Sequence, residues 1–368
     1  SLLIMNDERQ QAIDAVTRNG LALVYASDAW KNNAQVVTAA VMQNGRVLEI
    51  ASVECRNNEG VVIAAVTQNG LALQYASDEI KRSSVRVAVA AVTQNARALR
   101  IASGEMKNNA RVVTAAVARC GLVLEYASNE MKNNEQVVVA AVTQYGWALQ
   151  YASTEMRKNV RVVIAAVTQN GHALEFVSRE TMNNVRVAIA AVTQNGLVFR
   201  IVSSELKNSE RVVIAAVRQC GRVLKHASAE MRNNVRVVTA AVTQNGHALE
   251  YASNELKNNV RVATAAVTQN PLALQYASNE LRNNPQLVTA AVTHNTYSRA
   301  LEYASDEMKN NARVVTAAIT QNTSARSAFL LQSVSNQLKK NEKIVIDAVT
   351  KYGLVLQYAS VEMKNNAR

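Results

Sequence analysis

Residues 57–81 read NNEGVVIAAVTQNGLALQYASDEIK, and this 25-residue phrase decides the fold. Close copies of it follow one another about fourteen times along the 368 residues of the chain. A chain of this length exceeds one globular core, and self-similarity at a fixed short period is typical of a repeat array. We therefore expect an all-α protein, an α-solenoid of about fourteen two-helix repeats that form a superhelix.

The apolar residues of the phrase have the period of helices. Val62, Ala65 and Val66 form an i, i+3, i+4 stripe in the first half, which predicts one amphipathic helix. Leu73 and Ile80 continue the period in the second half, which predicts a second helix. Helices of about three turns are too short to be stable alone, so stacking on neighbouring repeats must stabilise them.

The ends of the first helix are marked by polar residues. Asn33, Asn109, Asn134 and Asn234 precede it in their copies and are expected to cap its free N–H groups, and Pro285 fits its first position. The pair of residues before the second helix holds Asn in first place or Gly in second in every copy. We expect a left-handed residue there, and hence a tight turn between two helices.

Two further positions are nearly constant. The position of Ala166 is Ala in every copy, which predicts helices so close that Ala166→Leu would destabilise the fold. Eight of the eleven tyrosines share another position, which Ile50, Ile101 and Ile201 fill in other copies. The isoleucines favour a packing role for the ring over an aromatic track for a ligand.

The array is expected to be one domain over residues 1–368. Regular repeats cover about 6–295, repeats with lengthened turns cover 296–335, and a regular repeat covers 336–368. Extra residues fall near Arg82 to Ser84, at Thr296 to Arg299 and at Thr323 to Ala328. These insertions are either harmless loops or part of a binding edge.

Composition excludes several classes of protein. The net charge is +12 and aromatic residues are only 4% of the chain, which leaves few rings to stack on bases or sugars. No apolar run reaches the roughly 18 residues of a membrane span, and Ser1 to Met5 show no secretion signal. Cys120 and Cys220 lie four repeats apart, too far for a disulfide, so we expect free thiols and a cytoplasmic location.

The phrase Val-Val-x-Ala-Ala-Val-x-Gln-Asn-Gly followed by Leu-Ala-Leu-x-Tyr-Ala-Ser resembles a repeat family known as domain of unknown function 4116. The resemblance covers nearly the whole chain, although Asn dominates here where that family usually has Asp before the first helix. It implies a relation to proteins of intracellular bacterial pathogens, including secreted effectors, and hence a place in the host cytosol if the chain is exported. It implies no activity and no catalytic residue.

Catalytic and metal chemistry find no support in the sequence. His172 and His247 share one repeat position three repeats apart, too far to hold one metal ion, and Cys220 and His226 have no third group to orient them. We expect no catalytic site, no metal and no cofactor, and we interpret the protein as a non-enzymatic scaffold.

Basic residues recur at two positions, late in the second helix and early in the first, and they account for most of the net charge. They are either a solvated edge of mixed charge, in which Glu79 pairs with Arg86, or an anion-binding stripe. The candidate anion-binding residues are Lys107, Arg111, Lys132, Arg157, Arg161, Lys207, Arg211, Arg232, Arg236, Lys257 and Arg261.

Copies differ most at the start of the second helix, at the residue after the junction and the residue three later. Variation on one helical face predicts a surface that reads a partner, and neutral drift is the alternative. Protein or peptide binding there is the favoured function, and nucleic-acid binding through the basic residues, which salt would weaken steeply, is the alternative. The candidate partner-binding residues are Arg46, Glu49, Arg97, Arg100, Trp147, His172, Glu175, Arg200, Arg222, Lys225, His247 and Glu250.

Overall fold

The computed structural model describes residues 2–293, 299–321, 330–351 and 353–366. In these residues the chain is an all-α helical repeat solenoid, as expected, and no strand occurs among them. The chain divides into two compact units, residues 1–194 and 195–368. Each unit is a stack of the same repeat.

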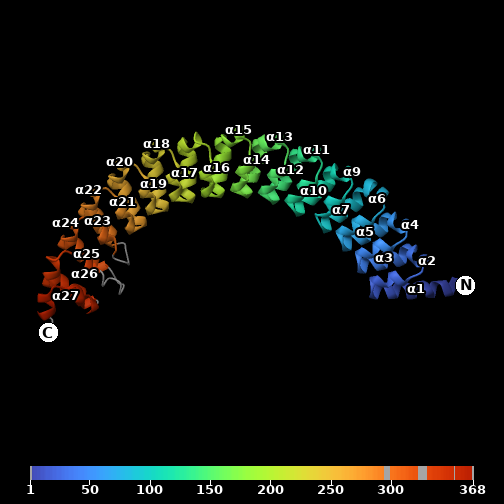
Figure 1. The fold of residues 1–368 in the computed structure, drawn as a ribbon, viewed down its shortest axis with the longest axis horizontal. Helices are drawn as coiled ribbons and strands as arrows, with labels where there is room; N and C mark the ends of the chain where they lie inside the picture. The colour runs from blue at the N-terminus through green and yellow to red at the C-terminus, as the bar shows by residue number, and fades with distance from the viewer. Residues whose placement is uncertain (1, 294–298, 322–329, 352, 367–368) are drawn as a thin grey trace. The chain divides into compact units, whose positions relative to one another are not determined.

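The first predicted helix of the repeat is present in every copy as a long α-helix. In each unit these long helices stand side by side, and each contacts its counterpart in the next repeat (Figure 1). In the first unit they are α1 (Leu2–Arg18), α3 (Ala34–Gln43), α5 (Glu59–Gln68), α7 (Val85–Gln94), α10 (Ala110–Arg119), α12 (Glu135–Gln144), α14 (Val160–Gln169) and α16 (Val185–Gln194). In the second they are α17 (Glu210–Gln219), α19 (Val235–Gln244), α21 (Val260–Gln269), α23 (Pro285–Thr293), α25 (Ala312–Gln321) and α27 (Glu342–Lys351).

The second predicted helix is wrong as a single element, because the chain forms two short helices there. The first is in most copies a 3-10 helix of about two turns, which contacts its counterpart in the next repeat. In the first unit this row is η1 (Gly20–Tyr25), η2 (Gly45–Ile50), η3 (Gly70–Tyr75), α8 (Ala98–Ile101), η4 (Gly121–Tyr126), η5 (Gly146–Tyr151) and η6 (Gly171–Phe176). In the second it is η7 (Gly196–Ile201), η9 (Gly221–His226), η10 (Gly246–Tyr251), η11 (Pro271–Tyr276), η12 (Arg299–Tyr303), α26 (Leu330–Ser333) and η15 (Gly353–Tyr358).

The other short helix is about one turn long, and these helices line one edge of each unit (Figure 1). In the first unit they are α2 (Asp28–Lys31), α4 (Val53–Arg56), α6 (Asp78–Ser83), α9 (Gly104–Lys107), α11 (Asn129–Lys132), α13 (Thr154–Lys158) and α15 (Arg179–Met182). In the second they are η8 (Leu206–Asn208), α18 (Ala229–Arg232), α20 (Asn254–Lys257), α22 (Asn279–Arg282), α24 (Asp306–Lys309), η14 (Leu338–Lys340) and α28 (Val361–Asn366).

The break between the two short helices has a local cause. Ala76 and Ser77 are extended, with ψ of 155° at both residues, so the helical hydrogen-bond ladder stops at Tyr75. The Ser77 hydroxyl then accepts from the Ile80 N–H and caps the next helix. The Ala-Ser pair of the repeat therefore ends one helix and starts another.

The junction before the 3-10 helix also differs from the prediction. Asn69 is extended, with φ −145° and ψ 104°, and the φ of Gly70 lies outside the left-handed region. Glycine is needed instead because the next repeat comes very close, since a Cβ on Gly70 would lie 2.3 Å from the carbonyl oxygen of Ala91. Asn69 accepts from the Leu71 N–H and caps the 3-10 helix.

The core of each repeat draws side chains from all three elements. Val62, Ala65 and Val66 of the long helix and Leu73 of the 3-10 helix are at most 1% exposed, and Ile80 of the short helix is 8% exposed. The expected caps of the long helices are confirmed, since Asn33 accepts from the N–H groups of its first turn. Pro285 is the first residue of α23, as predicted.

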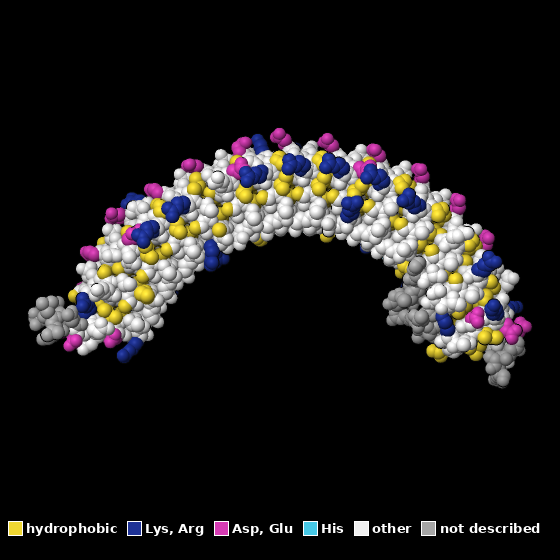
Figure 2. Space-filling model, turned by 180° about the vertical axis from the view of Figure 1, so that it is seen from behind, with side chains coloured by type: hydrophobic (Ala, Val, Ile, Leu, Met, Phe, Trp, Pro, Cys, Tyr) yellow, Lys and Arg dark blue, Asp and Glu magenta, His cyan; other side chains and the backbone are white. Residues whose placement is uncertain are grey.

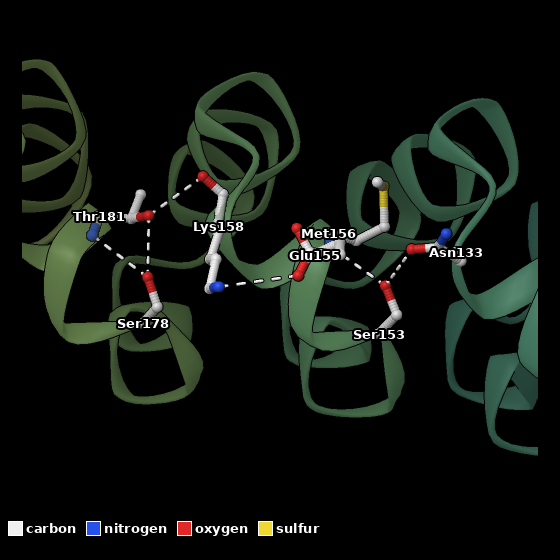
Figure 3. A network of polar contacts seen from close by, with 7 residues as sticks. All are labelled: Asn133, Ser153, Glu155, Met156, Lys158, Ser178 and Thr181. Atoms are coloured by element: carbon white, nitrogen blue, oxygen red, sulfur yellow. Dashed lines mark hydrogen bonds and ion pairs between the residues drawn. The ribbon is translucent and has the colours of Figure 1, made fainter.

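Polar contacts also join successive repeats along the edge of short helices. The Ser153 N–H donates to the carbonyl of Lys132 at 2.9 Å, and its hydroxyl donates to Asn133 Oδ1 at 2.6 Å (Figure 3). The same hydroxyl accepts from the Met156 N–H at 3.1 Å. One serine thus caps its own helix and bonds to the preceding repeat, and the pattern recurs at Ser77, Ser128, Ser228, Ser253, Ser278 and Ser305.

One of the three predicted insertions is visible in full. The extra residue near Arg82 to Ser84 lengthens α6 to Ser83, and Ser84 takes over as the cap of α7, because its hydroxyl accepts from the Val87 N–H. The insertion at Thr296 to Arg299 lies outside the described residues except for Arg299, and that at Thr323 to Ala328 lies wholly outside them.

Candidate binding surface

The two variable positions of the repeat lie on the 3-10 helices. In a 3-10 helix, residues three apart eclipse one another, so Arg222 and Lys225 share one side of η9 and point away from the buried Leu224. We call the residue after the junction and the residue three later in each copy the variable face. Because successive 3-10 helices touch within a unit, the variable face is a continuous row in each unit.

Most of the candidate partner-binding residues are accessible. The exposed ones are Arg46, Glu49, Arg97, Arg100, Glu175, Arg200, Arg222, Lys225 and Glu250, and the half-buried ones are Trp147, His172 and His247. His172 Nδ1 lies 3.2 Å from Glu175 Oε1, so two members of the face in one copy contact each other.

Leucines on the same face were missing from the candidates. Leu21 is 52% exposed, Leu71 37% and Leu122 36% in the first unit, and Leu197 is 62% exposed in the second. They occupy the same repeat position as Arg46 and Trp147, so the repeat alignment alone could have identified them. At the residue after the junction, apolar and basic side chains therefore alternate from Leu21 to Leu122.

Aromatic rings lie beside the variable face. The Trp147 ring packs edge-to-face on Phe176 of the next repeat at 5.5 Å between ring centres, and His247 packs in the same way on Tyr276 at 5.6 Å. Phe176 and Tyr276 stand at the recurrent tyrosine position. Each such ring is half-buried between its own repeat and the variable residue of the preceding one, which agrees with a packing role.

Basic groups gather on the variable face of the second unit. His226 takes the tyrosine position of η9, and burial is the main cause that lowers its pKa from the usual 6.5, with the charges of Lys225, Lys207 and Arg200 acting in the same direction. A hydrogen bond with Tyr251 is the main cause that raises the pKa of the neighbouring Arg222. Several positively charged side chains therefore lie close together in this stretch.

The basic residues late in the repeat are half-buried, which bears on the anion-binding hypothesis. They are Lys107, Lys132, Arg157, Lys207, Arg232 and Lys257. The main-chain carbonyl of Lys107 accepts from the Ser128 N–H of the next repeat, and Lys207 Nζ donates to the carbonyl of Arg200 at 2.8 Å. These side chains therefore present only part of their surface to solvent.

The basic residues early in the long helices form a second, exposed row. They are Arg111, Arg161, Arg211, Arg236 and Arg261. Arg161 pairs with Glu135 of the preceding repeat at 3.0 Å and Arg236 with Glu210 at 2.6 Å. Figure 2 shows acidic side chains along one edge of each unit, with basic side chains close to them.

The predicted pair of Glu79 and Arg86 is wrong. Arg86 pairs with Glu59 at 3.3 Å, and Glu79 Oε2 accepts from Asn57 Nδ2 at 3.0 Å. Glu79 stands on the short helix, whose side chains face the polar contacts between repeats, whereas Glu59 begins the long helix directly before that of Arg86.

The cysteines and histidines are dispersed. Cys55 is buried, and burial raises the pKa of its thiol, while Cys120 and Cys220 are half-buried at junctions. His294 lies outside the described residues. Within the described ranges, no three His, Cys, Asp or Glu side chains come close enough to share a metal ion.

The repeat geometry agrees with a family model. The model described as Domain of unknown function (DUF4116) matches residues 9–56, 46–81, 58–107, 85–132, 111–157, 134–182, 159–207, 184–232, 209–257, 234–282, 259–298 and 325–364. The chain belongs to this family. No curated protein and no solved structure matches the chain. Of the helices that are described, none has the length and apolar character needed to cross a membrane.

Proposed function

We propose that this member of the DUF4116 family is a non-enzymatic scaffold that binds a protein or peptide segment along its variable face. The observation that carries the proposal is that constant and variable residues occupy different places in the repeat. The constant residues are used in stacking, capping and bonds between repeats, whereas most of the residues that vary are exposed on the short helix that follows the junction.

The exposed leucines support an apolar contribution to binding. Leu21, Leu71 and Leu122 recur two repeats apart on the face and are 52%, 37% and 36% exposed, so each offers part of its apolar side chain to a partner. An extended peptide advances about 3.3 Å per residue, so about three of its residues would span one repeat of about 10 Å. Alternate apolar and charged side chains on such a peptide could then meet successive copies.

The alternative, nucleic-acid binding through the basic residues, receives less support. The late basic row is half-buried, and exposed arginines such as Arg161 and Arg236 are paired with carboxylates. Pairing of this kind reduces the positive potential that a phosphate backbone would meet. The variable face is therefore the better candidate.

Selection of peptides from a random library on the full chain tests the proposal. Leu71→Asp with Leu122→Asp should lower the affinity of the selected peptides by about tenfold or more, or about 1.4 kcal/mol, because apolar contact is lost. The matched control is Asn129→Asp with Thr154→Asp, two exposed first positions of short helices where added Asp is tolerated.

Three results would count against a peptide scaffold. They are failure to select any peptide, equal binding by both double variants, and binding of a single-stranded oligonucleotide that falls steeply with salt and survives the leucine substitutions. Far-ultraviolet circular dichroism and melting curves of both double variants establish that each is folded. Peptide binding that is lost only in the leucine variant is the expected outcome.

A further inference from the structure

Six junctions of the chain read Asn-Gly, the step at which the following residue protects asparagine least against loss of its side-chain amide. Glycine has no Cβ to hinder attack by its own backbone nitrogen on the preceding side-chain amide. These steps begin at Asn19, Asn44, Asn69, Asn170, Asn195 and Asn245. All six steps have the residues needed to lose ammonia. One of them differs from the other five in the hydrogen bonding of its glycine nitrogen.

A glutamine of the next repeat holds the glycine nitrogen at five of these steps. Gly70 N–H donates to Gln94 Oε1 at 2.6 Å, and Gln94 Nε2 in turn donates to the carbonyl of Gln68 at 3.3 Å. The equivalent bonds run from Gly20 to Gln43 at 2.9 Å, from Gly45 to Gln68 at 2.7 Å, from Gly171 to Gln194 at 2.7 Å and from Gly246 to Gln269 at 2.5 Å.

The step at Asn195 lacks this bond. Within the described residues, Gly196 N–H makes no hydrogen bond to Gln219, the glutamine that faces it. A Cβ on Gly196 would lie 2.9 Å from Gln219 Cβ and 3.0 Å from the carbonyl oxygen of Ala216. The corresponding oxygen lies 2.3 Å from the Cβ position at Gly70, so Gly196 sits farther from the helix it packs on.

Asn195 has the same backbone conformation and the same capping hydrogen bond as Asn69. Asn195 has φ −147° and ψ 106°, against −145° and 104° at Asn69, and its Oδ1 accepts from the Leu197 N–H at 3.0 Å. The side-chain amide carbon therefore stays beside the backbone in both copies. The difference between them lies at the glycine nitrogen, which is the nucleophile.

We propose that Asn195 is a site of spontaneous deamidation in this chain, and that the glutamine of the next repeat protects the other five Asn-Gly steps. The Gly196 nitrogen loses its proton and bonds to Asn195 Cγ, the Cγ–Nδ2 bond breaks, and ammonia leaves with the proton. Water then opens the cyclic imide at either carbonyl, which gives aspartate or isoaspartate. No electron is gained or lost.

The product changes the second unit at its first residue. Either product adds one negative charge at the cap of η7, directly before the variable face of the second unit. Isoaspartate also lengthens the backbone by one carbon directly before Gly196, which must move relative to Ala216. A hydrogen bond at the glycine nitrogen opposes the reaction because the bonded N–H must be released before it can lose its proton.

Peptide mapping by mass spectrometry, after incubation of the full chain at mildly alkaline pH, measures the rate at each of the six steps. Asn195 should deamidate several times faster than any of the other five, which serve as controls within the same molecule. Rates at Asn195 equal to those at the other steps would overturn the proposal.

A pair of variants tests the protective contact. Gln94→Ala should raise the rate at Asn69 to that at Asn195. Gln144→Ala should leave every Asn-Gly step unchanged, because the junction glycine at the equivalent position of the preceding repeat is Gly121, which follows Cys120 and not an asparagine. An unchanged rate at Asn69 in the first variant, or an equal rise at Asn69 in the second, would overturn the protective role of glutamine. Melting curves of both variants show whether either is unfolded.

Discussion

At the scale of single residues, the glycine of the junction and the glutamine of the next repeat behave as a pair. Where the junction has Ala96 in place of glycine, the next repeat has Arg119 in place of glutamine, and where it has Pro271, the next repeat has His294. Proline has no N–H to donate, so a glutamine acceptor would have nothing to bind there. At Pro271 the replacement of glutamine by histidine therefore costs no hydrogen bond.

Gly70→Ala should destabilise the first unit by about 1–3 kcal/mol, because the added Cβ would lie 2.3 Å from the carbonyl oxygen of Ala91 and force the two repeats apart. Urea denaturation followed by circular dichroism measures the loss. Gly104→Ala is the matched control, since a Cβ at Gly104 meets nothing within 4 Å. Equal stability of the two variants would show that the close approach at Gly70 is not needed.

The stability of the second unit should depend on the protonation of His226. Its pKa is lowered in the folded chain, first by burial and then by Lys225, Lys207 and Arg200, so the neutral form is favoured by folding. That contribution is present above the ordinary pKa of 6.5 and is lost as the pH falls through the lowered folded value. Denaturation curves at several pH values should therefore show that the free energy of unfolding falls on acidification. The fall should be smaller in His226→Tyr, which restores the common residue of this position. An equal fall in that variant would refute the prediction.

At the scale of the elements, two substitutions in neighbouring short helices compensate for each other. Lys158 replaces the asparagine that accepts from serine elsewhere, and Thr181 replaces the buried Met or Leu of other copies. The Ser178 hydroxyl donates to Thr181 Oγ1 at 3.0 Å, and the threonine hydroxyl donates to the carbonyl of Lys158 at 3.1 Å (Figure 3). The buried threonine, 5% exposed, takes over the role of the missing asparagine.

A double-mutant cycle measures this compensation. Thr181→Met should cost about 1–3 kcal/mol, because Ser178 loses its acceptor and the Lys158 carbonyl loses its donor. Adding Lys158→Asn should recover most of the loss, because it recreates the contact that Ser153 makes with Asn133. A coupling energy of zero between the two substitutions, from urea denaturation, would contradict the interpretation.

The sequence predicted the long helices well and the rest of the repeat less well, for physical reasons. Val62, Ala65 and Val66 repeat with the helical period and are buried, so periodicity alone located the long helix. Leu73 and Ile80 also fit the helical period but lie on two helices, because Ser77 caps the second one. A serine three residues before a buried apolar residue is a sequence signal for such a helix start. The glycine at 70 was correctly singled out, but the close approach of Ala91 could not be known before the repeats were stacked.

The variable face illustrates the same limit at the candidate site. Variation between copies located the face, and the eclipsed spacing of 3-10 residues then aligned Arg222 with Lys225 on one side. The exposure of Leu71 and Leu122 could not be predicted from the residue type, because leucine side chains are often buried in the core. Packing on the next repeat decides which leucines are buried.

At the scale of the whole molecule, each repeat rests on its immediate neighbours within a unit. The long helices contact the preceding and the following long helix, and the 3-10 helices do the same. Stability in such an array is approximately the sum of local terms, so a defect should remain local.

Ala166→Leu tests this at a residue that is fully buried in α14, where its carbonyl oxygen would lie 2.6 Å from a Cβ on Gly146. Overpacking there should cost about 1–3 kcal/mol and lower hydrogen-exchange protection in α12, α14 and α16. Protection in α19, α21 and α23 of the second unit should stay unchanged, and exposed Thr168→Leu in the same helix should affect neither unit. Hydrogen exchange read by mass spectrometry separates the two units, and a loss of protection that extends through α19 to α23 would mean that the array unfolds as one cooperative body rather than by neighbouring repeats.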